Sequence, residues 1–381
     1  MASERDDRHD ERVDDGNDTN GDTSVDTPRA PLAAPRFTGR GAANEPRNRF
    51  TTRQVERDPD AFEPEDARPE TRVHVDASRT VLARNQSPDV GFDVSLNPYR
   101  GCEHGCVYCY ARPTHEYLGL SAGLDFERQI FVKRDAPARL REALSKPSWT
   151  PRPIAMSGVT DPYQPLERRE RVTRGCLEVL AEFRQPLSLI TKNHLVTRDL
   201  DLLRELARHD AVAVTISITT LDDDLRASME PRTSSPSRRL AAIRALAEAG
   251  VPVGVNVAPV IPGLTDPEIP AILEAAAQAG ASFAGTIMMR LPHAVEEVFA
   301  SWLETREPAR ARRILARVRE VRGGRMNDPS FGSRMTGEGT YAEQVRALFR
   351  LACRRHGLDG RPALSSAAFR VPGRVEQARL F

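Results

Sequence analysis

The chain has 381 residues, a hydrophobic content of 39% and a formal net charge of +1, which suit one large folded unit with a sizeable core. Five cysteines in a chain of this length, three of them within 102–109, exclude a secreted protein stapled by disulfides and favour a reducing compartment. No apolar run reaches the roughly 20 residues that span a bilayer, and no hydrophobic signal segment follows the N-terminal charges. We therefore expect a soluble, cytoplasmic protein without a membrane partner.

The N-terminal stretch is rich in acidic residues and lacks large apolar side chains. Up to residue 30 it holds ten acidic residues and four arginines, so the rest of the chain carries a net charge of about +7. Such a segment cannot bury enough apolar surface to offset the entropy lost on ordering. We expect residues 1–36 to form a disordered acidic tail, and the charge of the remainder is compatible with a nucleic-acid substrate.

Residues 37–90 show no sustained periodicity, and we assign them to an N-terminal extension that wraps the core. Two short pieces within it, 73–76 and 80–84, have the composition of extended chain.

From residue 93 onward, short β-branched or apolar runs alternate with amphipathic segments, which is typical of βα units wound into a parallel sheet. Strands are expected near 93–96, 154–159, 187–191, 211–218, 251–258 and 283–289, and helices near 136–145, 167–183, 199–208, 236–249, 266–279 and 294–305. Six units are too few to close an eight-stranded barrel. The predicted fold is therefore α/β, a partial (β/α)6 barrel of the TIM type over residues 91–306.

The C-terminal part, residues 307–381, is predicted to be a helical extension. Helices are expected at 308–322 and 338–356, and we expect this region to pack across the barrel opening.

Cys102, Cys106 and Cys109 form a C-x3-C-x2-C motif. One loop brings three thiolates together, which suits an iron-sulfur cube whose fourth iron has no protein ligand. Zinc with His104 as the fourth ligand is the alternative, although no second ligand pair with zinc spacing occurs in the chain.

The cysteine motif, with Tyr108 just before its third cysteine, resembles the signature of the radical S-adenosylmethionine superfamily. Four more segments, 97–106, 158–167, 190–193 and 258–266, resemble the branch of that superfamily related to spore photoproduct lyase. The Gly-Arg-Gly-Ala and Asn-Arg-Phe pattern between residues 39 and 50 is similar to that of bacterial members with an undefined substrate.

This resemblance implies a (β/α)6 core with a 4Fe-4S cluster and S-adenosylmethionine as cofactors. It further implies an electron donor such as a flavodoxin or ferredoxin, and a 5'-deoxyadenosyl radical that abstracts hydrogen from the substrate.

The resemblance also implies contacts with the cofactor at the ends of the first two strands. Tyr108 would lay its ring beside the adenine, or simply pack under the cysteine loop. Gly158 would let the chain approach the cofactor amino group, or serve as a turn glycine. Thr160 and Asp161 would either cap the turn or bond cofactor or substrate.

Further along the chain, three residues correspond to cofactor contacts in that branch, and a fourth lies on the fifth strand. Lys192 would meet the methionine carboxylate or a substrate anion. Ser217 would contact the cofactor or only satisfy a neighbouring carbonyl. Arg232 would reach toward the cofactor carboxylate, or form a surface salt bridge, and Asn256 would add one polar contact.

The chain departs from the lyase pattern at one position. The lyase uses a hydrogen-donor cysteine after the second strand, whereas the segment 157–161 contains none. Tyr108 and Tyr110 match its tyrosines, so these two and Asp161 are our catalytic candidates for an unknown substrate, with nucleic acid as one option. The alternative is a non-catalytic iron-sulfur protein that binds nucleic acid or senses redox state. Cys176 and Cys353 lie in amphipathic patterns and are expected to be core residues.

Overall fold

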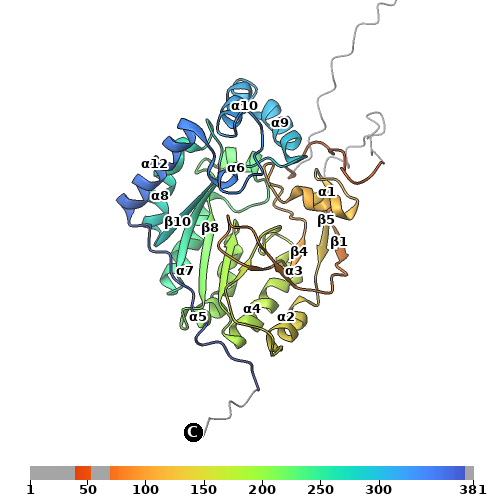
Figure 1. Ribbon diagram of the computed structural model, residues 1–381, viewed down its shortest axis with the longest axis vertical. Coiled ribbons are helices and arrows are strands. Elements are labelled where there is room, and N and C mark those ends of the chain that lie inside the picture. The colour runs from red at the N-terminus through yellow and green to blue at the C-terminus, as the bar shows by residue number, and fades with distance from the viewer. Residues whose placement is uncertain (1–38, 53–68, 374–381) are drawn as a thin grey trace, which may run out of the picture. The chain divides into compact units, whose positions relative to one another are not determined.

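The computed structural model describes residues 39–52 and 69–373, so the predicted acidic tail lies outside the described residues. Six parallel strands form the centre of the fold, as predicted, in the order β10-β9-β8-β7-β6-β3 (Figure 1). They are β3 (Val94–Leu96), β6 (Ile154–Met156), β7 (Leu187–Thr191), β8 (Val212–Ser217), β9 (Val253–Val260) and β10 (Phe283–Met288). The outer strands do not pair with each other, so the fold is α/β with an open, partial TIM-type barrel.

Side chains alternate between the two faces of the sheet. In β8, Val214 and Ile216 join the large apolar cluster that includes the helix residues Leu206 and Ile243. Thr215 and Ser217 have the opposite orientation, because successive side chains of a strand point to opposite faces. The helix-covered face is therefore rich in Val, Ile and Leu, whereas small and polar side chains line the inner face.

Helices follow the strands as predicted, and all of those named here except the last cover the outer face of the sheet. They are α2 (Ala136–Ser145), α4 (Val172–Phe183), α5 (Leu200–Ala207), α7 (Pro236–Glu248), α8 (Ile269–Gln278) and α9 (Val295–Arg306). The predicted helix 167–183 is interrupted, because Arg171 adopts a left-handed φ of 54° and separates α3 (Glu167–Glu170) from α4. Two predicted helices begin with short 3-10 turns, His194–Asp199 before α5 and Asp266–Glu268 before α8.

Several short elements were not predicted, since they have too few residues to show a period. They are β4 (Tyr99–Arg100), a 3-10 helix (Arg112–Leu118), α1 (Asp125–Arg128), β5 (Gln129–Val132) and α6 (Asp223–Met229). The two extended pieces of the N-terminal extension are confirmed as β1 (Arg72–Val75) and β2 (Leu82–Arg84). β1 joins a small sheet in the order β1-β5-β4, and β2 pairs antiparallel with β3.

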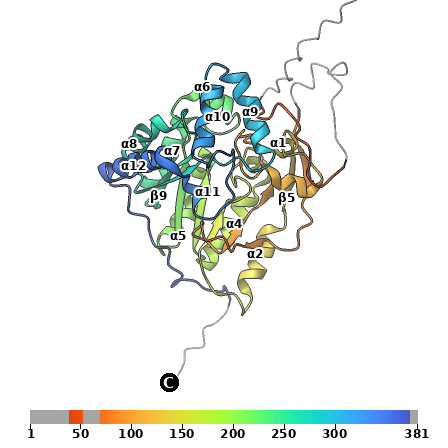
Figure 2. The same ribbon diagram turned by 45° about the horizontal axis from the view of Figure 1, so that its top comes forward.

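The C-terminal extension contains α10 (Ala311–Glu320), α11 (Ser333–Thr336) and α12 (Gly339–His356). α9 and α10 share an apolar cluster with Cys106 and Tyr108, so they pack beside the cysteine motif. α12 instead lies along α8 in both views (Figures 1 and 2), so the prediction that the whole extension crosses the barrel opening is wrong for this helix. The reason is its apolar face, which joins the outer core through Val345 and Ala352.

The chain after α12 covers the edge of the sheet. The Ala284 amide donates to the Leu358 carbonyl at 3.0 Å, and the Gly360 amide donates to the Ser282 carbonyl at 3.1 Å. These bonds satisfy backbone groups of β10 that an open barrel leaves unpaired. Within 39–52 and 69–373, no helix is long and apolar enough to cross a membrane.

Candidate active site

The three motif cysteines lie on one loop, residues 101–109, which we call the cluster loop. Gly101 and Gly105 have positive φ values of 79° and 68°, which glycine adopts without strain, and they turn the loop back on itself. Cys102 and Cys106 are buried and Cys109 is partly buried, and none of the three forms a disulfide. Short backbone turns link them, with the Cys109 amide 3.2 Å from the Cys106 carbonyl.

A buried ion pair braces the cluster loop from outside. The Arg112 guanidinium lies 2.5 Å from Glu127 Oε1 and donates to the carbonyls of Cys106 at 2.9 Å and Gly105 at 3.2 Å. The amides of Gly41 and the next residue donate to the Glu127 carboxylate at 3.0 and 2.8 Å. Our sequence analysis did not find this pair. Its partners belong to segments without a shared motif, and only the fold brings them together.

The donor set suits an iron-sulfur cube better than a zinc ion. Three thiolates on one loop suit a cube whose fourth iron is open, whereas structural zinc usually has four protein ligands. His104, the alternative zinc ligand, has both ring nitrogens engaged, Nδ1 at 3.3 Å from Asp161 Oδ2 and Nε2 at 3.2 Å from Asn193 Nδ2. An amide nitrogen only donates, so Nε2 accepts and is not free to bind a metal.

The cysteine thiols of the cluster loop lie in buried surroundings with nearby carboxylates, which favour a bound cation. Burial, followed by the charge of Asp161, raises the pKa of the Cys102 thiol well above its ordinary value. Burial and the charge of Glu230 do the same to the pKa of Cys106. Without metal these thiols stay protonated, and iron would displace their protons, because a bound cation inverts the local electrostatics.

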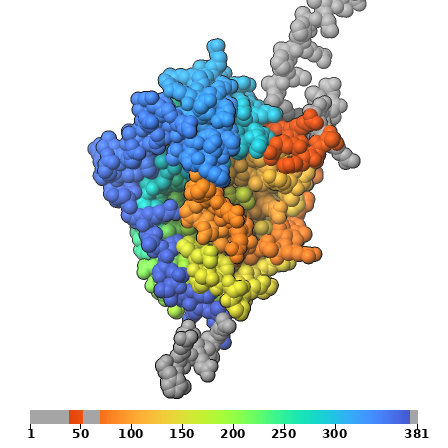
Figure 3. Space-filling model, in the orientation of Figure 1, coloured from red at the N-terminus to blue at the C-terminus, as the bar shows by residue number. Residues whose placement is uncertain are grey.

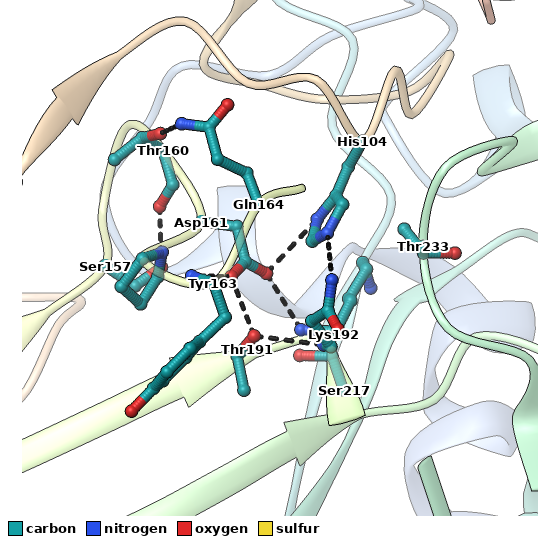
Figure 4. A network of polar contacts seen from close by, with 12 residues as sticks. His104, Ser157, Thr160, Asp161, Tyr163, Gln164, Thr191, Lys192, Ser217 and Thr233 are labelled. Carbon is teal, nitrogen blue, oxygen red and sulfur yellow. Dashed lines mark hydrogen bonds and ion pairs between the residues drawn. The ribbon is translucent and has the colours of Figure 1, made fainter. Parts of the chain in front are cut away.

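Asp161 joins the second and third βα turns to the cluster loop (Figure 4). Its Oδ1 accepts from the Tyr163 amide at 2.8 Å and the Thr191 hydroxyl at 2.7 Å, and its Oδ2 accepts from the Lys192 amide at 2.8 Å. Burial opposes the charge, but pairing with His104 and these hydrogen bonds outweigh it and hold the pKa of Asp161 below its ordinary value. The carboxylate is thus fully used by protein groups, which favours the turn-capping role over contact with substrate.

The turn after β6 also contacts the cluster loop. The Thr160 hydroxyl donates to the Gly101 carbonyl at 2.7 Å, so it fastens the turn to that loop. A Cβ at Gly158 would meet only the side-chain amide of Asn97, Oδ1 at 3.5 Å and Nδ2 at 3.7 Å, which are ordinary contacts, so the protein itself does not require glycine there. Ser157 has a φ of 113°, a strained conformation of the kind found at functional sites.

Lys192 places a cation at the carboxyl end of β7, beside the cluster loop (Figure 4). Its Nζ donates to the Ala258 carbonyl at 2.9 Å and the Thr219 hydroxyl at 3.3 Å, and lies 3.6 Å from Glu230 Oε1. The Tyr108 ring centroid is 5.8 Å from Nζ, and the Tyr108 hydroxyl bonds Glu230 and, at 3.1 Å, Thr219. Burial is the main cause that lowers the pKa of Lys192 to about 8.

Glu230 is the centre of this network and was not among our candidates. It is fully buried and paired with Arg239, whose Nη1 also donates to the Ser217 carbonyl at 3.0 Å. We selected Arg232 from the Glu-Pro-Arg-Thr segment, although Glu230 opens the same segment. The local sequence contains no signal of its burial, because Glu230 follows the short helix α6 and its partners come from other segments.

Ser217 and Asn256 lie side by side on neighbouring strands. They are register partners in the β8–β9 ladder. Neither side chain makes a hydrogen bond within the described ranges, so both polar groups remain available to a ligand. A Cβ at Gly285 on β10 would come within 3.0 Å of Asn256 Oδ1, so the glycine leaves room for this amide.

Arg232 and Tyr110 lie at the outer side of the loop. Arg232 Nη1 is 3.1 Å from Glu103 Oε1, and its amide donates to the His104 carbonyl, so it forms the salt bridge that was the alternative to cofactor contact. Tyr110 is 51% exposed, and its hydroxyl donates to the Gly158 carbonyl at 2.5 Å. Figure 3 shows one face of the molecule, which is hollowed between the orange segment of the N-terminal extension and the gold segment that follows the cluster loop.

Comparison with known proteins places this geometry in a family. Residues 96–276 match the model of the radical SAM superfamily. An uncharacterized protein of Mycobacterium tuberculosis (strain H37Rv) is 38% identical over 255 residues, which are 65% of this chain and 74% of that protein. An uncharacterized protein of Methanocaldococcus jannaschii is 31% identical over 173 residues, 45% of this chain and 62% of that protein.

Among solved structures, a point variant of spore photoproduct lyase has a TM-score of 0.52 and 20% identity, covering 74% of this chain and 78% of the lyase. Spore photoproduct lyase complexed with dinucleoside spore photoproduct covers the same shares with a TM-score of 0.51 and 19% identity. These two structures establish a shared fold. Enzymes of the superfamily use a 4Fe-4S cluster and S-adenosylmethionine and take an electron from a donor. The chain belongs to the radical S-adenosylmethionine superfamily and is an enzyme of that class.

Proposed function

We propose that Cys102, Cys106 and Cys109 hold a 4Fe-4S cluster whose open iron binds S-adenosylmethionine. When bound, the two cofactors supply a 5'-deoxyadenosyl radical for hydrogen abstraction from a substrate. The observation that carries the proposal is three thiols without disulfides, two of them buried and one partly buried, on one braced loop beside an unsatisfied polar face of the barrel.

The neighbouring side chains would position S-adenosylmethionine. Lys192 presents a buried cation for the methionine carboxylate. Ser217 and Asn256 offer free polar groups for the ribose or adenine, and the Tyr108 ring lies where an adenine could pack. Gly158 leaves space for the cofactor amino group. Thr160, Asp161 and Arg232 would act by holding the cluster loop in place.

The substrate of this proposal is a nucleic acid or a component of one. Two observations support it: the net charge of about +7 outside the acidic stretch, and the shared fold with a lyase solved with a dinucleoside. The turn directly after β6, residues 157–161, contains no cysteine, so return of a hydrogen atom would need another donor. The half-exposed Tyr110 is the candidate, whereas the Tyr108 hydroxyl is buried against a carboxylate. We further propose a cytoplasmic enzyme reduced by a flavodoxin or ferredoxin.

The test is cofactor cleavage by the anaerobically purified protein after reconstitution with iron and sulfide. We expect 5'-deoxyadenosine from S-adenosylmethionine under dithionite, and none from Cys106→Ala. Cys353→Ala is the matched control, because this cysteine lies on α12 outside the cluster loop, and it should keep both iron and cleavage. A full cluster without any cleavage, together with salt-sensitive nucleic-acid binding, would favour the non-catalytic binding or sensing function instead.

A further inference from the structure

Arg290 places a second cation at the carboxyl edge of the barrel, two residues after β10 ends. Its guanidinium lies 5.6 Å from the ring centroid of Tyr110, the residue that directly follows Cys109. On its other contact, Nη1 is 3.6 Å from the thioether sulfur of Met335. The side chain is therefore held between an aromatic ring and a methionine next to the cluster loop.

Arg290 forms no ion pair among the residues that the structure describes, and the carboxylate that acts on it, Asp89, is already paired with Arg334. Its Nε is buried and makes no hydrogen bond. Burial, followed by the charge of Arg334, lowers its pKa. Other buried arginines are well bonded: Arg239 pairs with Glu230, and Arg322 makes four hydrogen bonds to backbone carbonyls. A half-buried charge without a counter-charge is costly unless a ligand supplies one.

Arg290 differs in position from the other arginines whose Nε is buried without a hydrogen bond. Arg128 and Arg184 also have a buried, unbonded Nε. Arg184 follows α4 and precedes β7, so it lies at the amino edge of the parallel sheet, away from the cluster loop. Arg128 ends α1 and precedes the small sheet. Arg334, whose charge helps to lower the pKa of Arg290, is already paired with Asp89.

We propose that Arg290 binds an oxyanion of the substrate, a phosphate or a carboxylate, and holds it beside the cluster loop, with the Tyr110 ring supporting the guanidinium. The planar fork of arginine matches both anions through two parallel hydrogen bonds. The Tyr110 ring and Met335 would fix the plane of the fork before the anion arrives. This inference rests on the proposed function, since it concerns the substrate of the same site.

Calorimetry on the anaerobic, cluster-loaded protein would test the proposal with three probes. These are thymidylyl-thymidine with its phosphodiester, the same dinucleoside with an uncharged methylphosphonate link, and the dicarboxylate glutarate. If phosphate is the source, the charged dinucleoside binds, the uncharged one does not, and Arg290→Met weakens binding by about tenfold or more. If the bound group is a carboxylate, glutarate binds instead, and Arg290→Met weakens the binding of glutarate by a similar factor. Binding of neither charged probe, or binding unaffected by Arg290→Met, would overturn the proposal.

Thermal unfolding separates anion binding from a structural role. Arg290→Met removes only the contact to the Met335 sulfur and the contact with the Tyr110 ring, so its melting temperature without anions should stay within about 2 °C of wild type. Arg322→Met loses four backbone bonds and should melt far lower. If Arg290→Met melts as low as Arg322→Met, Arg290 is structural and the inference is wrong.

The matched control is Arg184→Met, which removes an equally unbonded arginine from the other edge of the sheet. It should keep both probe binding and 5'-deoxyadenosine formation. Measuring cofactor cleavage on the same wild-type preparation separates the two proposals. Cleavage without anion binding removes this inference alone, and anion binding without cleavage removes only the proposed function.

Discussion

Gly41 is the residue whose substitution tests the brace of the cluster loop most directly. A Cβ at this position would lie 1.8 Å from the Gly105 carbonyl oxygen and 3.1 Å from Val107 Cγ1. The position of a Cβ is set by its own backbone, and the atom it would meet first is a backbone oxygen. No rotation of a side chain can therefore relieve this contact. Gly41→Ala must therefore move the N-terminal extension away from the cluster loop.

The expected cost follows from the bonds that such a movement breaks. The amides of Gly41 and the next residue donate to Glu127 at 3.0 and 2.8 Å. Hydrogen bonds to a charged group contribute roughly 1.5–3 kcal/mol each, so losing both costs about 3–6 kcal/mol. Glu127 would also hold Arg112 less firmly, and Arg112 bonds the carbonyls of Cys106 and Gly105.

Urea denaturation and iron analysis after reconstitution measure the two consequences. Gly41→Ala should unfold at lower urea concentration and retain less iron than wild type. Gly91→Ala is the control, because a Cβ there has no atom within 4 Å, and it should stay within about 0.5 kcal/mol of wild type. A Gly41→Ala protein with wild-type stability and a full iron content would refute the brace.

Three further predictions concern buried titratable side chains around the site. Glu127→Gln leaves Arg112 buried without its counter-charge and should cost about 3–5 kcal/mol in urea denaturation, a result that equal stability would contradict. Burial lowers the pKa of His115 to about 4 from its ordinary 6.5. As pH falls, the His115 imidazole therefore takes up its proton at a higher pH in the unfolded chain than in the folded protein, and this difference favours unfolding. His115 should weaken the fold by about 3 kcal/mol between pH 6.5 and 4. His115→Gln should lack this part of the acid sensitivity, and an unchanged pH profile would argue against it. Lys192→Met should raise KM for S-adenosylmethionine by about tenfold with iron content unchanged, whereas an unchanged KM would exclude contact with the cofactor carboxylate.

The sequence alone was sufficient for the repeated elements of the fold. The six parallel strands and their helices follow from β-branched runs and amphipathic periods longer than one turn. The cysteine motif was equally clear, because Cys102, Cys106 and Cys109 are close together in the chain and their spacing by itself predicts a cluster site.

Only the tertiary structure identified what surrounds that loop. The Arg112–Glu127 brace with Gly41, the buried Glu230, and the unpaired Arg290 beside Tyr110 join segments far apart in sequence. It also assigned Asp161 to the turns and Arg232 to a salt bridge with Glu103. Whether a charged side chain is paired or free depends on its burial and on neighbours from other strands, and the local sequence contains neither. The chain order therefore determined the repeated units and the cysteine motif, while packing decided which of the remaining charges are left for a ligand.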